Sequence, residues 1–184
     1  IAPHEKFGGL FWSNQGLIQI DLRNSESFIE MALLHEAVHA VTINIMTRTF
    51  SLLTGIKEWD KLRGTEYLVA LESVSTNAAT PPGLKLIVDA YLQHVTNPTH
   101  EWMSETAIAR LGDYQDVDRI FTLRPDQADY ASLNIHEFVA VSLSHPDMAN
   151  RLSYVQAFVP NPKADSFGEL VEGVSRLAGM ALDE

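Results

Sequence analysis

The chain contains no cysteine, which excludes disulfide bonds and metal sites built from thiolates. This absence fits a cytosolic protein and also permits a secreted one. The sequence likewise shows no internal repeat and no low-complexity tract. Its 184 residues, 46% of them hydrophobic, are enough to bury a core and predict one domain, or one domain with an appendage.

Basic residues are also scarce. Lys and Arg total 13 against 24 Asp and Glu, giving a net charge of -11, and no basic cluster interrupts this balance. Nucleic acid is therefore not an expected partner. No apolar run approaches the length of a membrane span, so no span is expected. The first residue is Ile1 and no signal-peptide pattern follows it, so we expect a processed fragment or a domain excised from a larger protein.

Two short β-prone runs stand near the N-terminus. Residues 10–12 and 17–22 flank a Ser-Asn-Gln-Gly turn, and the second run alternates apolar and polar side chains. This pattern predicts a β-hairpin. A strand placed just before a site of peptide chemistry could hold an extended peptide along its edge.

The rest of the chain is predominantly helical in pattern. Ser27 and Glu30 form a capping-box pattern that predicts a helix from about residue 28 to about residue 46. Apolar spacing and Pro or Gly breaks predict further helices, over about residues 56–74, 84–95, 100–111, 135–144 and 166–182, with loop over 112–129 and a short helix ending near 158. We therefore expect a mostly helical α+β fold with a small hairpin or sheet packed on the first helix.

The most informative pattern is His35-Glu36-Ala37-Val38-His39, which reads HExxH inside the first helical run. Residues four apart share a helix face, so His35 and His39 can both bind one metal ion. Glu36 lies one step round the helix, where its carboxylate can reach a water on that metal. These groups are what zinc-dependent amide hydrolysis needs, with Glu36 as general base. The alternative is a structural helix with partly buried histidines and a solvent-facing Glu36.

A catalytic zinc normally has three protein ligands and keeps one position for water. The extended motif HExxHxxGxxH does not continue here, because Thr42 and Ile45 occupy the Gly and His positions. The third ligand must come from farther along the chain, where the candidates are Glu137, His136, His100, Glu101 and His94.

Two islands of sequence, at about residues 17–41 and 130–147, resemble known zinc peptidases. The segment YASLNIHEFVA, residues 130–140, is similar to the second motif of the anthrax lethal factor-like peptidases: a Tyr, six intervening residues, Glu-Phe, an aromatic or aliphatic residue, and Ala. The chain also resembles metallopeptidase domains of large multidomain bacteriophage proteins, in which HEAxHA precedes an N-x-x-EF-x-A pattern and a later Pro. The matching residues here are Asn134, Glu137, Phe138, Ala140 and Pro146.

This resemblance implies a zincin-like fold and a gluzincin-type site. Glu137 would be the third zinc ligand beside His35 and His39, and Tyr130 would donate its hydroxyl to the oxyanion of the substrate. The families usually carry a second Glu four residues after the ligand, where this chain has Val141. If that Glu supports a histidine ligand, the support is missing here or comes from elsewhere.

Glu137 and Tyr130 can each have a purely structural role instead. Asn134 and Glu137 also form a capping-box-like pair, which would give Glu137 a purely capping role. Tyr130 could be an ordinary half-buried tyrosine.

The expected activity is that of a zinc endopeptidase acting on a protein or peptide substrate, in the bacterial cytoplasm or as a phage virion or injected protein. A single domain, residues 1–184, would consist of the strands with the HExxH helix (1–55), a helical insert (56–112), a third-ligand region (113–160) and a C-terminal helix (161–184). The rival hypothesis is a catalytically idle zinc-binding structural or interaction module of a larger phage or bacterial protein. Val141 favours the rival, and the intact Glu36 argues against it.

Overall fold

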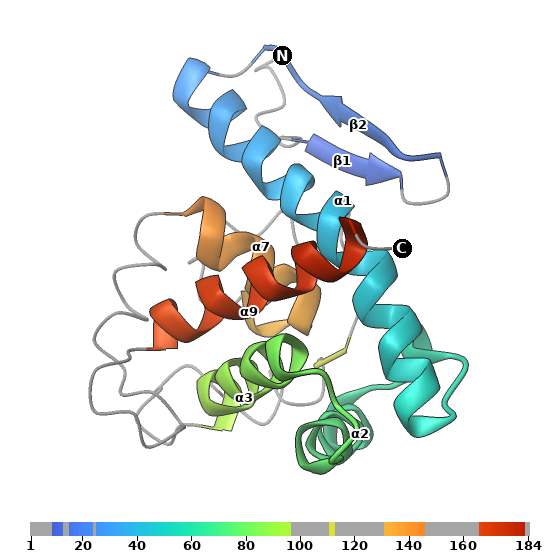
Figure 1. Cartoon of the computed structure of the whole chain (residues 1–184). Coiled ribbons are helices and arrows are strands. Elements are labelled where there is room, and N and C mark those ends of the chain that lie inside the picture. Colours follow the sequence, from blue (N-terminus) through green and yellow to red (C-terminus); the bar gives the residue numbers. More distant parts are fainter. Residues whose placement is uncertain are drawn as a thin grey trace.

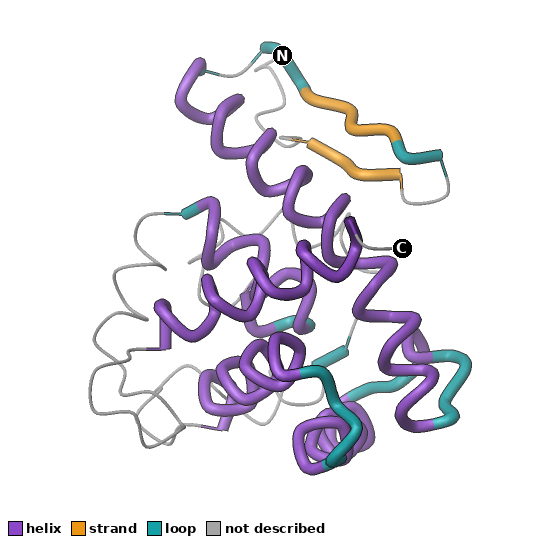
Figure 2. The backbone as a smooth tube through the Cα atoms, in the orientation of Figure 1, coloured by secondary structure: helices purple, strands orange, loops and turns teal. Residues whose placement is uncertain are grey.

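The structure, a computed structural model, describes residues 9–12, 15–23, 25–96, 111–112, 131–145 and 166–182. Helices dominate these residues, and their only sheet is one two-stranded hairpin (Figures 1 and 2). The expected mostly helical α+β composition is therefore confirmed.

The predicted hairpin is present. Strands β1 (Gly9–Trp12) and β2 (Leu17–Ile20) pair antiparallel, and Gly16 adopts a positive φ of 61° in the turn. Along β2 the side chains of Ile18 and Ile20 are half-buried while their neighbours are exposed, as the alternating pattern predicts. Both strands contact the helix that carries HExxH, and the hairpin lies beside the N-terminal half of that helix (Figure 1).

The HExxH helix, α1 (Glu26–Thr54), is longer than predicted. The sequence estimate ended it near Met46, but no Gly or Pro occurs before Gly55, and the buried Phe50 extends the apolar face. Gly55 ends the helix in the left-handed conformation, with φ 73°, and its amide donates to the Ser51 carbonyl at 2.9 Å. The stop signal is therefore a glycine cap rather than the weakening of apolar periodicity.

The predicted capping box at the start of α1 is wrong. Ser25 is the N-cap residue and makes no side-chain capping hydrogen bond, and Ser27 lies within the first turn. Ser25 instead contacts Ser27, with their hydroxyl oxygens 3.5 Å apart. The spacing of Ser27 and Glu30 was a chance match to the motif.

The single helix predicted over residues 56–74 is split. A short 3-10 helix, η1 (Trp59–Lys61), precedes α2 (Gly64–Thr76), and Arg63 between them is extended. Gly64, the first residue of α2, adopts a positive φ of 54°, which a residue with a side chain would disfavour.

Three further helices agree with the sequence. They are α3 (Pro82–Thr96), α7 (Ile135–Ser144) and α9 (Ser166–Leu182). Pro82 occupies the first position of α3, where its missing N–H costs nothing. The predicted helices over 100–111 and up to 158, and the loop over 112–129, lie outside the described residues except at 111 and 112.

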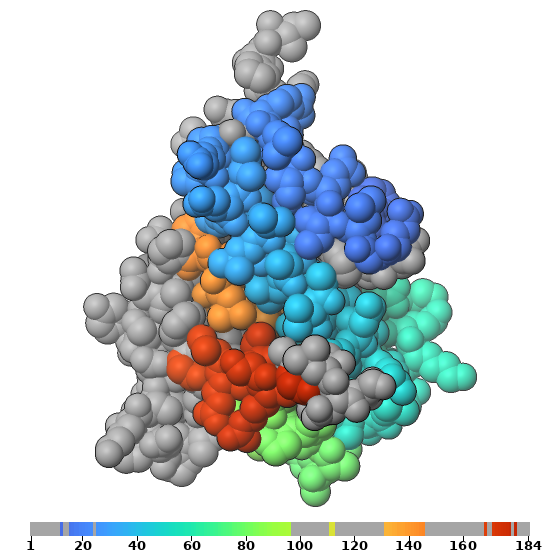
Figure 3. Space-filling model, turned by 45° about the horizontal axis from the view of Figure 1, so that its top comes forward, coloured from blue at the N-terminus to red at the C-terminus, as the bar shows by residue number. Residues whose placement is uncertain are grey.

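Helix α9 packs against α3 and also contacts α1 and α7. In the space-filling view it lies on the surface between α3 and α1 (Figure 3). Within its predicted apolar stripe Leu177 is fully buried, whereas Val171 remains 39% exposed. The backbones of α3 and α9 approach closely enough that a Cβ built on Gly83 would lie 2.8 Å from the Gly173 carbonyl.

Among the described helices, α1 is long and apolar enough, by length and composition alone, to cross a membrane. This differs from the expectation that no apolar run approaches such a length. Core helices of soluble proteins meet the same criterion, and α1 contacts the hairpin, α2, α7 and α9.

A chain of aromatic rings joins the helices through the core. Phe50 stacks on Trp59 with ring centroids 4.7 Å apart, and Trp59 meets Tyr67 edge-on at 6.3 Å. Tyr67 in turn meets Tyr91 at 6.3 Å, and Tyr91 meets Phe138 at 5.5 Å. Such pairs each add about 0.5–1.5 kcal/mol beyond the area they bury. They connect α1, α2, α3 and α7 in one rigid path.

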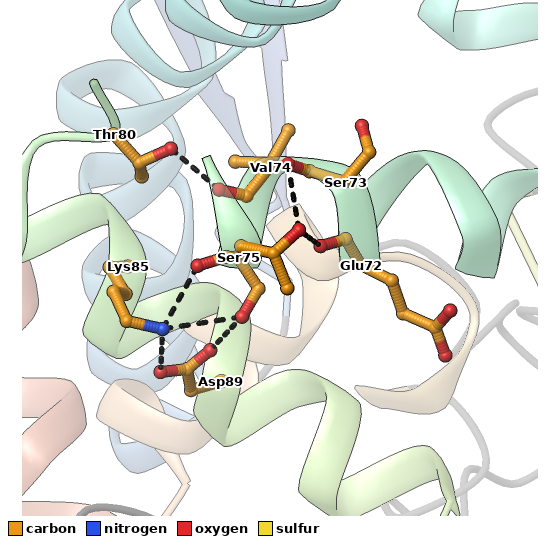
Figure 4. Close-up of polar contacts among 8 residues, drawn as sticks. Glu72, Ser73, Val74, Ser75, Thr80, Lys85 and Asp89 are labelled. Carbon is orange, nitrogen blue, oxygen red and sulfur yellow. Dashed lines mark hydrogen bonds and ion pairs between the residues drawn. The ribbon is translucent and has the colours of Figure 1, made fainter. Parts of the chain in front are cut away.

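A polar cluster locks α2 to α3 (Figure 4). The buried Asp89 carboxylate accepts hydrogen bonds from the Ser75 hydroxyl and, at 2.8 Å, from Lys85 Nζ. Lys85 Nζ also donates to the Ser75 carbonyl at 2.9 Å, and Thr80 Oγ1 donates to the Val74 carbonyl at 2.5 Å. The cluster thus compensates a buried charge and satisfies two carbonyls in the last turn of α2, those of Val74 and Ser75.

Candidate metal centre

Two helices bring three potential ligands together. Helix α1 supplies His35 and His39, and α7, which packs against it, supplies Glu137. The two Nε2 atoms are 3.0 Å apart. Glu137 Oε2 lies 3.2 Å from His35 Nε2, and its Oε1 lies 3.4 Å from His39 Nε2. Of the described His, Asp and Glu side chains, these three form the one cluster with metal-binding geometry.

Hydrogen bonding alone cannot satisfy all three contacts. Each Nε2 carries at most one proton, and a carboxylate carries none, so two donors face three short contacts. If both histidines donate to Glu137, their 3.0 Å contact joins two N–H groups with no acceptor. Three ligand atoms that lie 3.0–3.4 Å from their neighbours in the cluster are instead an arrangement that a cation satisfies.

The spacing fits zinc. Ligand atoms about 2.0–2.1 Å from Zn²⁺ in tetrahedral geometry lie about 3.3 Å from one another. The observed separations run from 3.0 to 3.4 Å. Two imidazoles and one carboxylate are also a common ligand set of catalytic zinc sites, which leave a fourth position open.

Electrostatics favour an ionised carboxylate at the centre. Burial alone would raise the pKa of Glu137, but the charge of His39 and hydrogen bonds from His35 and His39 hold this pKa well below its usual value. Burial likewise disfavours the charged form of His39, but Glu137 and Glu36 outweigh it and raise the pKa of His39. Helix α7 therefore presents an anionic ligand to the two rings of α1.

Glu36 is buried beside these ligands, with 7% of its surface exposed. Its negative charge contributes to the raised pKa of His39. The alternative of a solvent-facing Glu36 is therefore wrong. A carboxylate withdrawn from water beside a metal site is suited to receive a proton there.

The remaining candidates for the third ligand either lie away from the three potential ligands or fall outside the residues that the structure describes. His136 is buried on another face of α7, its ring 6.5 Å from that of Phe50, and burial lowers its pKa to about 3. His94 Nε2 pairs with the Ser132 hydroxyl in the core, 3.1 Å apart. Two further candidates and two residues of the second motif lie outside the described residues: His100, Glu101, Tyr130 and Pro146.

The Glu137 carboxylate does not serve only as a helix cap. Asn134 is the N-cap residue of α7, and its side-chain oxygen accepts from the amides of His136 and Glu137, both at 3.0 Å. The carboxylate of Glu137 lies against His35 and His39 instead. The capping pattern and the ligand position therefore coexist in one turn of helix.

One of the three potential ligands, His39, lacks the usual support on its second nitrogen. His39 Nδ1 is buried and has no hydrogen-bond partner within the described parts of the chain. Metal-binding histidines normally donate from that nitrogen to a carboxylate, a carbonyl or water. Val141, buried one turn after Glu137, offers no such group.

Sequence reasoning gave no role to Tyr67 and Tyr91. Both are fully buried, and their hydroxyls hold the segment that leads into α7. Their role could have been suspected from one signal: a tyrosine at a core position of a helix buries its hydroxyl, and a buried hydroxyl needs a hydrogen-bond partner.

Comparison of the chain with protein-family models, curated proteins and solved structures finds no significant match.

Proposed function

We propose that the chain is a zinc-dependent endopeptidase with a gluzincin-type His, His, Glu site and a zincin-like domain. The observation that carries this proposal is the convergence of His35, His39 and Glu137 from two helices, with Glu36 buried beside them. The hairpin packed along α1 supports it, since an extended substrate could pair with a strand edge near the motif helix. The bacterial or phage setting follows from the resemblance.

The residues have distinct roles in this mechanism. His35, His39 and Glu137 would hold Zn²⁺, which when bound polarises the scissile carbonyl and acidifies water. Glu36 accepts the proton of the attacking water and passes it to the nitrogen of the leaving amine. Tyr130 donates a hydrogen bond to the oxygen that gains negative charge. The low exposure of Glu36 limits the hydration of its carboxylate.

Replacing Glu36 tests the catalytic claim. In zinc-loaded protein, Glu36→Gln should retain the metal and lose about 10²–10⁴-fold in cleavage of a labelled, unfolded protein. His39→Ala should lose both metal and cleavage. Glu30→Gln is a matched control, because Glu30 is an exposed carboxylate on the same helix. Undiminished cleavage by zinc-loaded Glu36→Gln would refute the role of Glu36.

A second candidate is a catalytically idle zinc-binding module of a larger protein. It is favoured by the unpartnered Nδ1 of His39 within the described structure, together with Val141. Stoichiometric zinc with no cleavage of any unfolded substrate would support this candidate over the endopeptidase.

A further inference from the structure

The first turn of α7 takes its capping bonds from two different parts of the fold. Asn134 serves the amides of His136 and Glu137. The amide of Ile135 donates instead to the hydroxyl of Tyr67 on α2, at 3.0 Å and 68 positions away in the sequence. First-turn amides have no partner within their own helix, so each needs such an acceptor.

The segment before α7 is anchored in the same way. The Tyr91 hydroxyl donates to the Ser132 carbonyl at 2.8 Å, and His94 Nε2 pairs with the Ser132 hydroxyl. The amide of Gly112 donates to the Leu133 carbonyl at 2.6 Å. Ser132 and Leu133 are buried, so their backbone groups would otherwise be unsatisfied in the core. The helical insert thus supplies the bonds that fix the approach to α7.

Tyr67 is also tied to the helix that carries the histidines. Its ring packs edge-on against Trp59, which stacks on Phe50 of α1. One path of contacts therefore runs from α1 through Tyr67 to the amide of Ile135, two residues before Glu137. The Tyr67 hydroxyl fixes the first turn of α7 relative to α1, and a Phe of the same ring size has no hydroxyl to accept this hydrogen bond.

We infer that Tyr67 is a positioning residue for the metal centre, which holds the Glu137 carboxylate at binding distance from His35 and His39 through the Ile135 amide. This inference rests on the proposed function. A zinc site needs ligand atoms placed within a few tenths of an ångström, and the ligands here come from separate helices. Loss of a group hydrogen-bonded directly to a metal ligand typically weakens metal affinity about 10–100-fold. Tyr67 acts one step farther away, through the Ile135 amide, so an effect at the lower end of this range is expected.

The test compares zinc dissociation constants, measured by competition with a chelating dye, in wild type, Tyr67→Phe and Val74→Ala. Val74 is a fully buried side chain on the same helix and forms no side-chain hydrogen bond to α7, so Val74→Ala controls for general destabilisation. We expect about a tenfold or greater rise in the dissociation constant for Tyr67→Phe and little change for Val74→Ala. All three dissociation constants are measured well below the melting temperatures of the proteins.

Cobalt substitution adds a spectroscopic readout that loss of stability alone would not move. The visible absorption bands of bound Co²⁺ report the geometry of its ligands. They should change in Tyr67→Phe and stay as in wild type in Val74→Ala. If Tyr67→Phe does not fold, Tyr91→Phe tests whether hydroxyls of the insert position α7 at all, since the Tyr91 hydroxyl holds Ser132. An unchanged zinc dissociation constant in that variant would then overturn the positioning role.

The outcomes separate the two claims. Tight zinc binding by wild type, with an unchanged dissociation constant and cobalt spectrum in Tyr67→Phe, would overturn the positioning role and leave the zinc site intact. Absence of zinc binding in wild type would overturn the proposed function itself, and the positioning role with it.

Discussion

Substituting Gly173 with alanine tests how closely α9 packs on α3. A Cβ at this position would lie 2.8 Å from the Gly83 carbonyl oxygen and 2.9 Å from Ile87 Cγ1. A backbone carbonyl cannot rotate away, so the two helices must separate. Overpacking of this kind costs about 1–3 kcal/mol, against a gain of about 0.5–1 kcal/mol from replacing a helical glycine. We expect a net loss of about 1–2 kcal/mol in the free energy of unfolding.

Gly179 provides a matched control on the same helix. Outside its own stretch of helix, no atom of the described residues lies within 4 Å of a Cβ built there, so Gly179→Ala should keep the helix-forming gain of about 0.5–1 kcal/mol. Urea titration measures both values, and a change of 1 kcal/mol corresponds to about 2–4 °C in melting temperature at this chain length. The two substitutions should therefore change stability in opposite directions. Equal stabilisation by both would refute the close crossing of α3 and α9.

Two further expectations concern the metal and pH. Free zinc at about 100 times its dissociation constant should stabilise the folded chain by about 2.7 kcal/mol. Chelation should remove this gain, and His39→Ala should show none, so a melting temperature insensitive to zinc in wild type would contradict the site. In metal-free protein, burial lowers the pKa of His136 from 6.5 to about 3. Below pH 6.5 the unfolded chain binds a proton at His136 that the folded chain does not bind, so the free energy of unfolding falls as the pH is lowered. The contribution of His136 to stability is therefore fully present above pH 6.5 and is lost as the pH falls toward 3, by about 1.4 kcal/mol per pH unit. His136→Gln should flatten the profile over that range, and an unchanged slope in urea titrations at several pH values would contradict the shift.

Local signals predicted much of the fold. The Ser-Asn-Gln-Gly turn predicted the hairpin, and Asn134 preceded the predicted start of α7. The helix predicted from about residue 84 begins slightly earlier, at Pro82, inside the predicted Pro-Pro-Gly break. The length of α1 was missed because its end is set by Gly55, beyond the point where apolar spacing weakens. The break before α2 was missed because it depends on a positive φ at Gly64, which apolar spacing does not reveal.

The candidate site was likewise predictable from the sequence only in part. His35 and His39 are related by helical spacing, so their shared face could be predicted from the motif alone. Glu137 lies far along the chain, and only the resemblance singled it out from several candidates. The role of Tyr67 depends on a backbone amide of another helix, a contact that no local pattern encodes.

Metal content tests the central claim most directly. Plasma mass spectrometry of purified wild type, Glu137→Ala and the control Glu30→Ala measures zinc per chain after excess metal is removed. The account expects about one zinc in wild type and in Glu30→Ala, and clearly less in Glu137→Ala. No zinc in wild type, even after zinc has been supplied, would contradict the metal centre and the peptidase proposal built on it.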